Sequence, residues 1–283
     1  MKLTSLPEFK RRIYTLHGRY RYIDPCWRSR LSGCELKDCS AWQSVRPASV
    51  ITETDTTQVY RVTSSEGRLI FKRYSVGPSW RYFLRPGRAA CEWSGLHALR
   101  NADIPVPELV AFGEDRVMGR LTAGYVITRE IESAMDLETF AVKVWYAMPQ
   151  PQKKQVFNAI RTLVFDIVKR AHHHLLFHHD LYWRNILIGQ ANGEYQLWLI
   201  DCPRLKRGGF MRAHARMVDL SCLARVALSM LSSTERFRSL LLFLDGDRQQ
   251  ARLLFREIEA HHRRSRHPPK IFDPAQRHAS ETT

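Results

Sequence analysis

The spacing of apolar residues changes its period near the middle of the chain. After Pro47 the sequence reads SVITET and then TQVYRVTSSEGRLIFKRY, which alternates and is rich in β-branched and aromatic side chains. Such segments are typical of strands, and SSEG at residues 64–67 has the composition of a hairpin turn. The pattern therefore predicts a small sheet of three strands.

A helix and two further strands are expected next. Residues 88–100, RAACEWSGLHALR, repeat apolar side chains every three to four positions, as an amphipathic helix does. Pro105 and Pro107 exclude a helix from the following IPVPELVAFGE, and GYVITREI at 124–131 reads as a short apolar strand. The predicted order within residues 48–131 is β-β-β-α-β-β.

The second half of the chain has mainly helical periodicity. Helices are predicted for 137–147, 152–174, 217–230, 235–244 and 248–262. The exceptions are ILI and YQLWLID, two short strands joined across an Asn192-Gly193 turn.

These elements predict an α+β fold with two lobes and a cleft between them. The small N-terminal lobe is β-rich with one main helix, and the larger C-terminal lobe is mostly helical. The expected divisions are a basic, irregular extension (1–40), the N-lobe (41–131), the C-lobe (132–268) and a polar tail (269–283).

Composition narrows the class of protein. A chain of 283 residues with 44% hydrophobic residues can bury a substantial core. No apolar run approaches the roughly 18–20 residues of a membrane span, and the N-terminus lacks the apolar core of a signal peptide. We expect a cytoplasmic protein with reduced thiols, because its cysteines form no CxxC pair. The spacing of Cys26, Cys34, Cys39 and His17 fits no zinc pattern well.

The charge balance favours an anionic partner. Lys and Arg number 44 against 28 Asp and Glu, a formal net charge of +16. This field attracts nucleic acid, anionic lipid or a phosphorylated substrate. Nucleic acid is the less favoured partner, because the chain has no zinc finger, RNA-recognition signature or basic low-complexity tail.

Residues 178–185, HHDLYWRN, have the H-x-D-x-x-x-x-N spacing of a kinase catalytic loop. In such a loop the Asp accepts the proton of the acceptor hydroxyl, and the Asn holds a metal ion beside the phosphates. Asp180 is therefore the candidate catalytic base, and Asn185 is a candidate ligand of ATP and metal. Asp201 ends the second hairpin strand sixteen residues later, where kinases place a metal-binding Asp.

Lys72 and Glu92 complete the candidate ATP site. Lys72 lies on the third strand and Glu92 on the first helix, as in kinases, where the Lys contacts the phosphates and the Glu holds the Lys. Adenine is expected against the linker at 128–131, with Glu130 and Ile131 as contacts.

Two further residues are expected to support the catalytic loop. We expect His178 to brace the loop backbone. Asp219 either accepts hydrogen bonds from the backbone of that loop or caps the N-terminus of its own helix. The row 172–174 of three histidines is not expected to bind one metal ion, because consecutive helical side chains diverge.

The segments LIFKRY, IPVPELVAFGE, YVITREI, HHDLYWRNILI, LIDCPRL and MVDLSCLARV, with the Glu92 helix, cover about residues 48–230. Together they resemble the lipopolysaccharide kinase (Kdo/WaaP-like) family of the protein-kinase-like superfamily. The resemblance implies Mg²⁺-dependent transfer of phosphate from ATP to a heptose or Kdo sugar of the lipopolysaccharide inner core. It also implies an anionic, lipid-linked glycan as acceptor and peripheral contact with the inner membrane.

Basic residues follow the candidate metal ligand Asp201 and suit such an acceptor. They are Arg204, Lys206, Arg207, Arg212 and Arg216.

Two departures from protein kinases keep other functions open. The loop 53–57 contains no glycine, whereas protein kinases cover the phosphates with G-x-G-x-x-G. Only seventeen residues separate Asp201 from Asp219, without an A-P-E motif, which disfavours a peptide acceptor. The alternatives are a Ser/Thr protein kinase, another small-molecule kinase of the same fold, and a pseudokinase binding module. The oligomeric state is not indicated.

Overall fold

A computed structural model describes residues 18–33, 49–75, 82–83, 85–209 and 212–264. The chain divides into two compact units. The sheet unit comprises 1–101, 106–132 and 201–204, and the helical unit comprises 102–105, 133–200 and 205–283. Residues 1–17 and 34–40 of the basic extension, with His17, Cys34 and Cys39, and the predicted polar tail lie outside the described residues.

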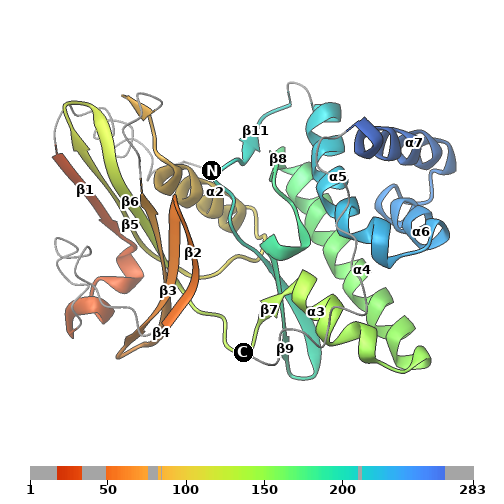
Figure 1. Ribbon diagram of the computed structural model, residues 1–283, viewed down its shortest axis with the longest axis horizontal. Coiled ribbons are helices and arrows are strands. Elements are labelled where there is room, and N and C mark those ends of the chain that lie inside the picture. The colour runs from red at the N-terminus through yellow and green to blue at the C-terminus, as the bar shows by residue number, and fades with distance from the viewer. Residues whose placement is uncertain (1–17, 34–48, 76–81, 84, 210–211, 265–283) are drawn as a thin grey trace. The chain divides into compact units, whose positions relative to one another are not determined.

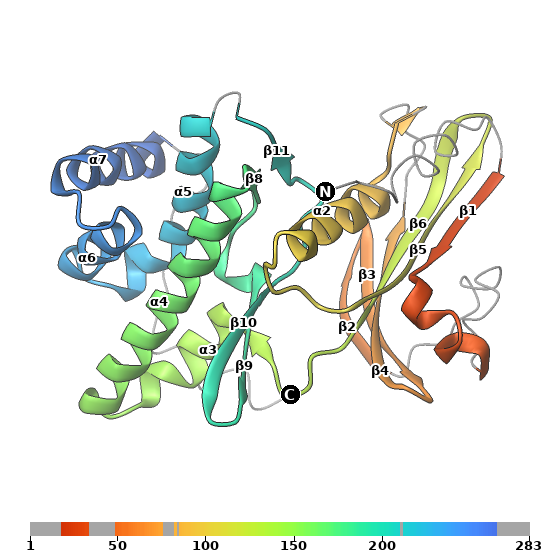
Figure 2. The same ribbon diagram turned by 180° about the vertical axis from the view of Figure 1, so that it is seen from behind.

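The sheet unit is built on a six-stranded antiparallel sheet with the order β1-β5-β6-β4-β3-β2. Its elements are β1 (Gly18–Ile23), β2 (Ser49–Thr54), β3 (Thr57–Ser64), β4 (Gly67–Ser75), α2 (Arg88–Asn101), β5 (Leu109–Val117) and β6 (Arg120–Arg129). The predicted β-β-β-α-β-β order is confirmed, and Figures 1 and 2 show α2 beside the sheet.

The prediction of an irregular chain before residue 40 is wrong for residues 18–33. Strand β1 pairs with β5, and 3₁₀ turns at Pro25–Trp27 and Arg30–Gly33 follow it. Tyr20 and Tyr22 alternate with arginines and place their rings against Phe112 at 5.4 and 6.0 Å. This strand was not predicted, because the tyrosines alternate with arginines and the segment contains few aliphatic residues.

Aromatic and aliphatic side chains form the core of the sheet unit. One cluster contains Trp27, Tyr60, Phe71 and Tyr125, with Phe71 stacked between the two tyrosine rings at centroid distances of 4.9 and 5.3 Å. Trp93 of α2 stacks on Phe112 of β5, with their ring centroids 4.9 Å apart. Burial of this apolar area holds α2 against the sheet.

Within the described residues, the helical unit has five α-helices and three short pairings of strands. The helices are α3 (Leu137–Lys143), α4 (Gln150–His173), α5 (Arg212–Met230), α6 (Ser233–Phe243) and α7 (Arg248–Arg264). The strands are β7 (Met135–Asp136), β8 (Leu176–Phe177), β9 (Ile186–Ala191), β10 (Glu194–Leu199) and β11 (Lys206–Arg207). Pairs form between β7 and β9, β9 and β10, and β8 and β11.

The hairpin of β9 and β10 has the predicted turn. Asn192 and Gly193 both have positive φ, 53° and 80°, which a type I′ turn requires. The predicted helix over 137–147 is shorter than expected, because α3 ends at Lys143 and a 3₁₀ turn follows at Trp145–Ala147. None of the helices in the described part of the chain combines the length and apolar character that a membrane span needs.

Candidate active site

The sheet unit brings three predicted site residues together. The Nζ atom of Lys72, on β4, lies 2.6 Å from Oδ1 of Asp201 and 3.2 Å from Oε2 of Glu92, on α2. Glu92 is nearly buried, with 6% of its side chain exposed, and its carboxylate also accepts a hydrogen bond from the Tyr74 hydroxyl. A single glutamate on the face of a helix is usually solvated, and the burial of Glu92 excludes that role here.

The electrostatics of this cluster keep Lys72 charged. Burial lowers the pKa of Lys72, but the charges of Glu92 and Asp201 outweigh it, so the net shift is upward. Burial raises the pKa of Glu92, and Lys72 opposes that shift. Burial, together with these two carboxylates, also raises the pKa of the neighbouring Cys202 thiol well above its usual value. Lys72 is thus a fixed positive charge, which is what contact with phosphate requires.

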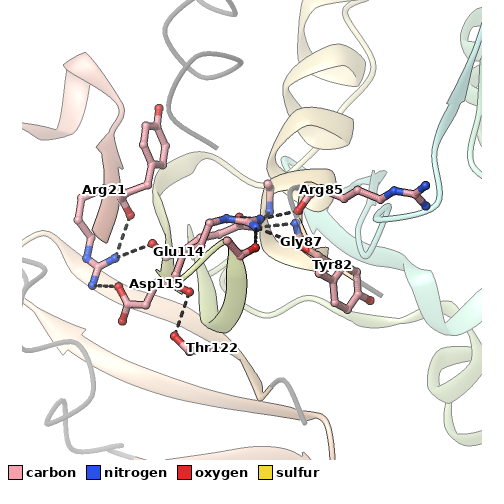
Figure 3. A network of polar contacts seen from close by, with 11 residues as sticks. Arg21, Tyr82, Arg85, Gly87, Glu114, Asp115 and Thr122 are labelled. Carbon is pink, nitrogen blue, oxygen red and sulfur yellow. Dashed lines mark hydrogen bonds and ion pairs between the residues drawn. The ribbon is translucent and has the colours of Figure 1, made fainter. Parts of the chain in front are cut away.

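A buried ion pair fixes the start of the helix that carries Glu92. The carboxylate of Glu114, on β5, accepts hydrogen bonds from the backbone N–H groups of Gly87 (2.9 Å) and Ala90 (3.2 Å), at the N-terminus of α2 (Figure 3). Its other oxygen lies 2.9 Å from Nη2 of Arg116. An acceptor at this place satisfies N–H groups that have no partner within the helix.

The same network explains the residue type at position 87. A Cβ atom on Gly87 would lie 2.5 Å from Oε1 of Glu114, so a larger residue would displace the carboxylate. Burial raises the pKa of Glu114, and Arg116 opposes the shift. Arg116 also donates to the backbone carbonyls of Tyr82, Arg85 and Gly119. Glu114 was not predicted, because its role depends on the register of β5 against α2.

Asp219 holds the catalytic loop of the helical unit by its backbone. Its Oδ2 accepts from the N–H of His178 at 3.0 Å, and its Oδ1 accepts from the N–H of His179 at 2.7 Å. The ring of His172 contacts the same carboxylate at 2.9 Å, and Asp219 is 1% exposed. The expectation that Asp219 stands at the head of its helix is wrong, since it lies in the middle of α5 and caps nothing.

The loop itself is held in an unusual conformation. His179 has φ of 60°, a left-handed conformation that a non-glycine residue adopts at a cost. His178 Nε2 lies 3.0 Å from the carbonyl of Ile200, and Asn185 Nδ2 donates to the carbonyl of Asp180 at 2.7 Å. These bonds join the loop to the end of β10 and fix the backbone on both sides of Asp180, which is half-buried.

Two predicted residues offer oxygen ligands suited to Mg²⁺. Asp201 supplies a carboxylate, and it has φ of 55°, a strained conformation of the kind found at functional sites. Asn185 uses its amide nitrogen for Asp180, so its amide oxygen is the atom suited to a cation. Among the described residues, no group of three or more His, Cys, Asp or Glu side chains is placed to hold a metal ion by itself.

Glu130, one of the two predicted adenine contacts, has partners within the sheet unit. The N–H of Glu130 donates to the carbonyl of Arg68 at 2.9 Å, and its carboxylate pairs with Arg61 (2.7 Å) and Arg68 (3.0 Å). The amide and the side chain of Glu130 are therefore engaged within the sheet unit, and a role in ATP binding stays a prediction for Glu130 and for Ile131.

The glycine-free loop is a tight turn. Strand β2 ends at Thr54 and β3 begins at Thr57, so only Asp55 and Thr56 connect them. The Thr54 hydroxyl accepts from the N–H of Thr57 and donates to its carbonyl, both at 3.1 Å. A threonine hydroxyl closes this turn without glycine.

Comparison with known proteins connects these two sets of residues to one family. The family model described as lipopolysaccharide kinase (Kdo/WaaP) family matches residues 50–241. A 3-deoxy-D-manno-octulosonic acid kinase of Haemophilus influenzae is 32% identical over 135 residues, 46% of this chain and 51% of that protein. One of Actinobacillus succinogenes is 27% identical over 163 residues, 56% of this chain and 60% of that protein. The matches thus span about half to three fifths of these relatives.

A solved structure shares the fold. It is titled "WaaP in complex with acyl carrier protein", has a TM-score of 0.62 and 19% sequence identity, and the match covers 85% of this chain and 98% of that one. This likeness confirms the predicted α+β, protein-kinase-like fold. The family model covers well over half of the residues and includes the positions of Lys72, Glu92, Asp180 and Asp201. The chain belongs to the lipopolysaccharide kinase (Kdo/WaaP) family.

Proposed function

We propose that this protein transfers the γ-phosphoryl group of ATP to a hydroxyl of a Kdo sugar in the lipopolysaccharide inner core. The observation that carries the proposal is the half-buried Lys72, held by Glu92 and Asp201 in the arrangement that kinases use for ATP. Kdo is proposed ahead of heptose, because both curated relatives are named as kinases of 3-deoxy-D-manno-octulosonic acid.

Each residue has a defined task in this reaction. Lys72 pairs with the phosphates, and Glu92 limits its side chain to one position. Asp180 orients the acceptor hydroxyl and accepts its proton, which makes the oxygen a better nucleophile. Asp219 and His178 keep the Asp180 backbone in place through the bonds described above. Asp201 and Asn185 would hold Mg²⁺. The bound ion would neutralise negative charge on the transferred phosphate.

Basic side chains near the catalytic loop favour an acidic acceptor. Strand β11, which contains Lys206 and Arg207, pairs with β8 directly before the loop. Burial lowers the pKa of His179 in the loop, and the charges of Lys206 and His214 lower it further, although Asp219 opposes them. A carboxylated or phosphorylated glycan is attracted to such a surface.

Transfer of labelled phosphate tests the proposal. Purified protein is incubated with Mg²⁺, γ-labelled ATP and one of three acceptors: a Kdo-containing lipid A precursor, a heptose-containing core glycan without Kdo, or a generic peptide substrate. The proposal predicts label on the Kdo acceptor alone, and loss of label in Asp180→Asn. Label on the heptose glycan or the peptide, with none on Kdo, would show a different acceptor.

An apolar cavity in the helical unit suggests a partner as well. It lies among α3, α4, α5, α6 and α7, and the space between its walls, counting open solvent at the mouth, is about 990 Å³. Residues around it include Phe140, Ile160, Val164, Leu223, Ala227 and Leu240. Because the solved relative was in complex with acyl carrier protein, we propose that this chain also binds one, with the acyl chain in the cavity.

Filling the cavity tests this partner. Ala227, on α5, is 8% exposed and faces the cavity, so Ala227→Leu reduces the space that an acyl chain needs. Ala213→Leu is the matched control on the same helix, since Ala213 is exposed. We expect purified acyl carrier protein loaded with a fatty acyl chain to bind wild type and Ala213→Leu, and to bind Ala227→Leu at least tenfold more weakly. Equal binding by all three would refute the role of the cavity.

A further inference from the structure

Two arginines share one aromatic ring beside the candidate catalytic base. Tyr182 lies two residues after Asp180, and the guanidinium carbon of Arg184 lies 4.6 Å from the centroid of its ring. The guanidinium carbon of Arg225, which α5 contributes, lies 5.4 Å from the same centroid. Both contacts are within the range of cation–π attraction.

The ring and its loop are anchored to α5. The indole N–H of Trp183, next to Tyr182, donates to the carbonyl of Leu223 on α5 at 2.9 Å. Tyr182 is in hydrogen-bond contact with Cys222, which raises its pKa in addition to the larger effect of burial. The neighbouring Trp183 thus anchors the loop, and Cys222 holds the Tyr182 hydroxyl. The ring of Tyr182 can therefore hold guanidinium groups in defined positions.

Neither arginine has an acidic partner within the residues that the structure describes. Arg116, by contrast, has a carboxylate partner, Glu114, at 2.9 Å. Arg184 is exposed, whereas Arg225 is half-buried and its Nε atom is buried without a hydrogen-bond partner in the described chain. Two neighbouring positive charges repel each other, and an anion bound to both relieves that repulsion.

We propose that Arg184 and Arg225 together bind the carboxylate of the acceptor sugar and so set the specificity of the enzyme for an acidic sugar. This inference rests on the proposed function, because it concerns the acceptor of the same reaction. Guanidinium groups form paired hydrogen bonds with a carboxylate, and Lys cannot reproduce that geometry. Arg184 lies four residues after Asp180 in the same loop, and its guanidinium group is held over the ring of Tyr182, two residues from Asp180.

The test compares two acceptors and five proteins. The acceptors are a soluble Kdo glycoside with a free carboxylate and no phosphate, and the methyl ester of the same glycoside. The proteins are wild type, Arg184→Gln, Arg184→Lys and Arg225→Gln, with Arg252→Gln as control, since Arg252 is exposed on α7. Steady-state kinetics give kcat and KM for each acceptor, and the KM for ATP is measured separately.

The inference predicts a specific pattern. For the free acid, each Gln variant raises KM about tenfold or more while kcat and the KM for ATP change little, because a charge-assisted hydrogen bond is lost in binding. Arg184→Lys recovers only part of the loss, and Arg252→Gln behaves as wild type. For the methyl ester, wild type already has the raised KM, and the Gln variants change it no further.

Contrary results separate this inference from the proposed function. Wild-type transfer to the free acid, with unchanged KM in both Gln variants, would overturn the role of the arginines and leave the kinase activity standing. The same is true if the variants raise KM equally for the acid and the ester. No transfer to Kdo by wild type would instead overturn the proposed function.

Discussion

Asp219→Asn tests whether one buried carboxylate holds the catalytic loop in place. The two backbone N–H groups of His178 and His179 donate to different oxygens of Asp219. Asn keeps one oxygen and places an NH₂ group where the other was, so one buried N–H loses its acceptor. A hydrogen bond to a charged group contributes about 1.5–3 kcal/mol, and we therefore expect a loss of about 3 kcal/mol in the free energy of unfolding.

Urea and thermal unfolding measure this loss. For a unit of this size, about 3 kcal/mol lowers Tm by roughly 6–12 °C. The matched control is Asp166→Asn on α4, where an Asp that is 59% exposed pairs with Arg170 at 3.0 Å. Such an exposed pair contributes about 0.5 kcal/mol or less. If Asp219→Asn unfolds like this control, the hydrogen bonds of Asp219 do not stabilise the loop, and the reasoning is refuted.

Three further substitutions test other parts of the site. Lys72→Met is expected to lower kcat at least about 100-fold, because the positive charge that Lys72 provides to the phosphates is lost. An unchanged kcat with saturating ATP would contradict this role. Cys222→Ala tests alkaline stability. Burial raises the pKa of the Cys222 thiol from 9.0 to about 11. The neutral thiol therefore stabilises the folded state below pH 9, and this stabilisation, roughly 3 kcal/mol, is lost as pH rises to 11. Urea unfolding at pH 8.5 and 10.5 should show a smaller pH dependence for Cys222→Ala, and an identical pH dependence would refute the assignment. Glu114→Ala leaves Arg116 buried without its carboxylate and is expected to cost about 3–5 kcal/mol in unfolding free energy, measured by urea, whereas exposed Glu66→Ala should cost less than about 1 kcal/mol.

The sequence was informative where chemistry depends on local spacing. Asp180 and Asn185 share one loop, and their five-residue separation is visible without any structure. Lys72 and Glu92 could also be proposed, because a strand followed by an amphipathic helix limits where each side chain can lie. The structure adds that Glu92 is 4% exposed and bound to both Lys72 and Tyr74, which periodicity could not distinguish from a solvated position.

Contacts between distant segments were not predictable in the same way. Glu114 reaches the start of α2 only because of the register in which β5 lies, and Arg225 meets Tyr182 only because α5 packs beside the loop. Asp219 was assigned to a helix start because the apolar period begins near residue 217, but the polar residues from Arg212 onward are helical too. Polar residues in a first helical turn give no apolar signal.

The most direct test of the account is a fragmentation mass spectrum of the acceptor after reaction with purified protein, ATP and Mg²⁺. The Kdo-containing acceptor should gain one phosphate group, located on the Kdo residue, with wild type and not with Asp180→Asn. An acceptor without added phosphate, or with phosphate on another residue, while wild type binds ATP normally, would contradict the assignment of this protein as a Kdo kinase.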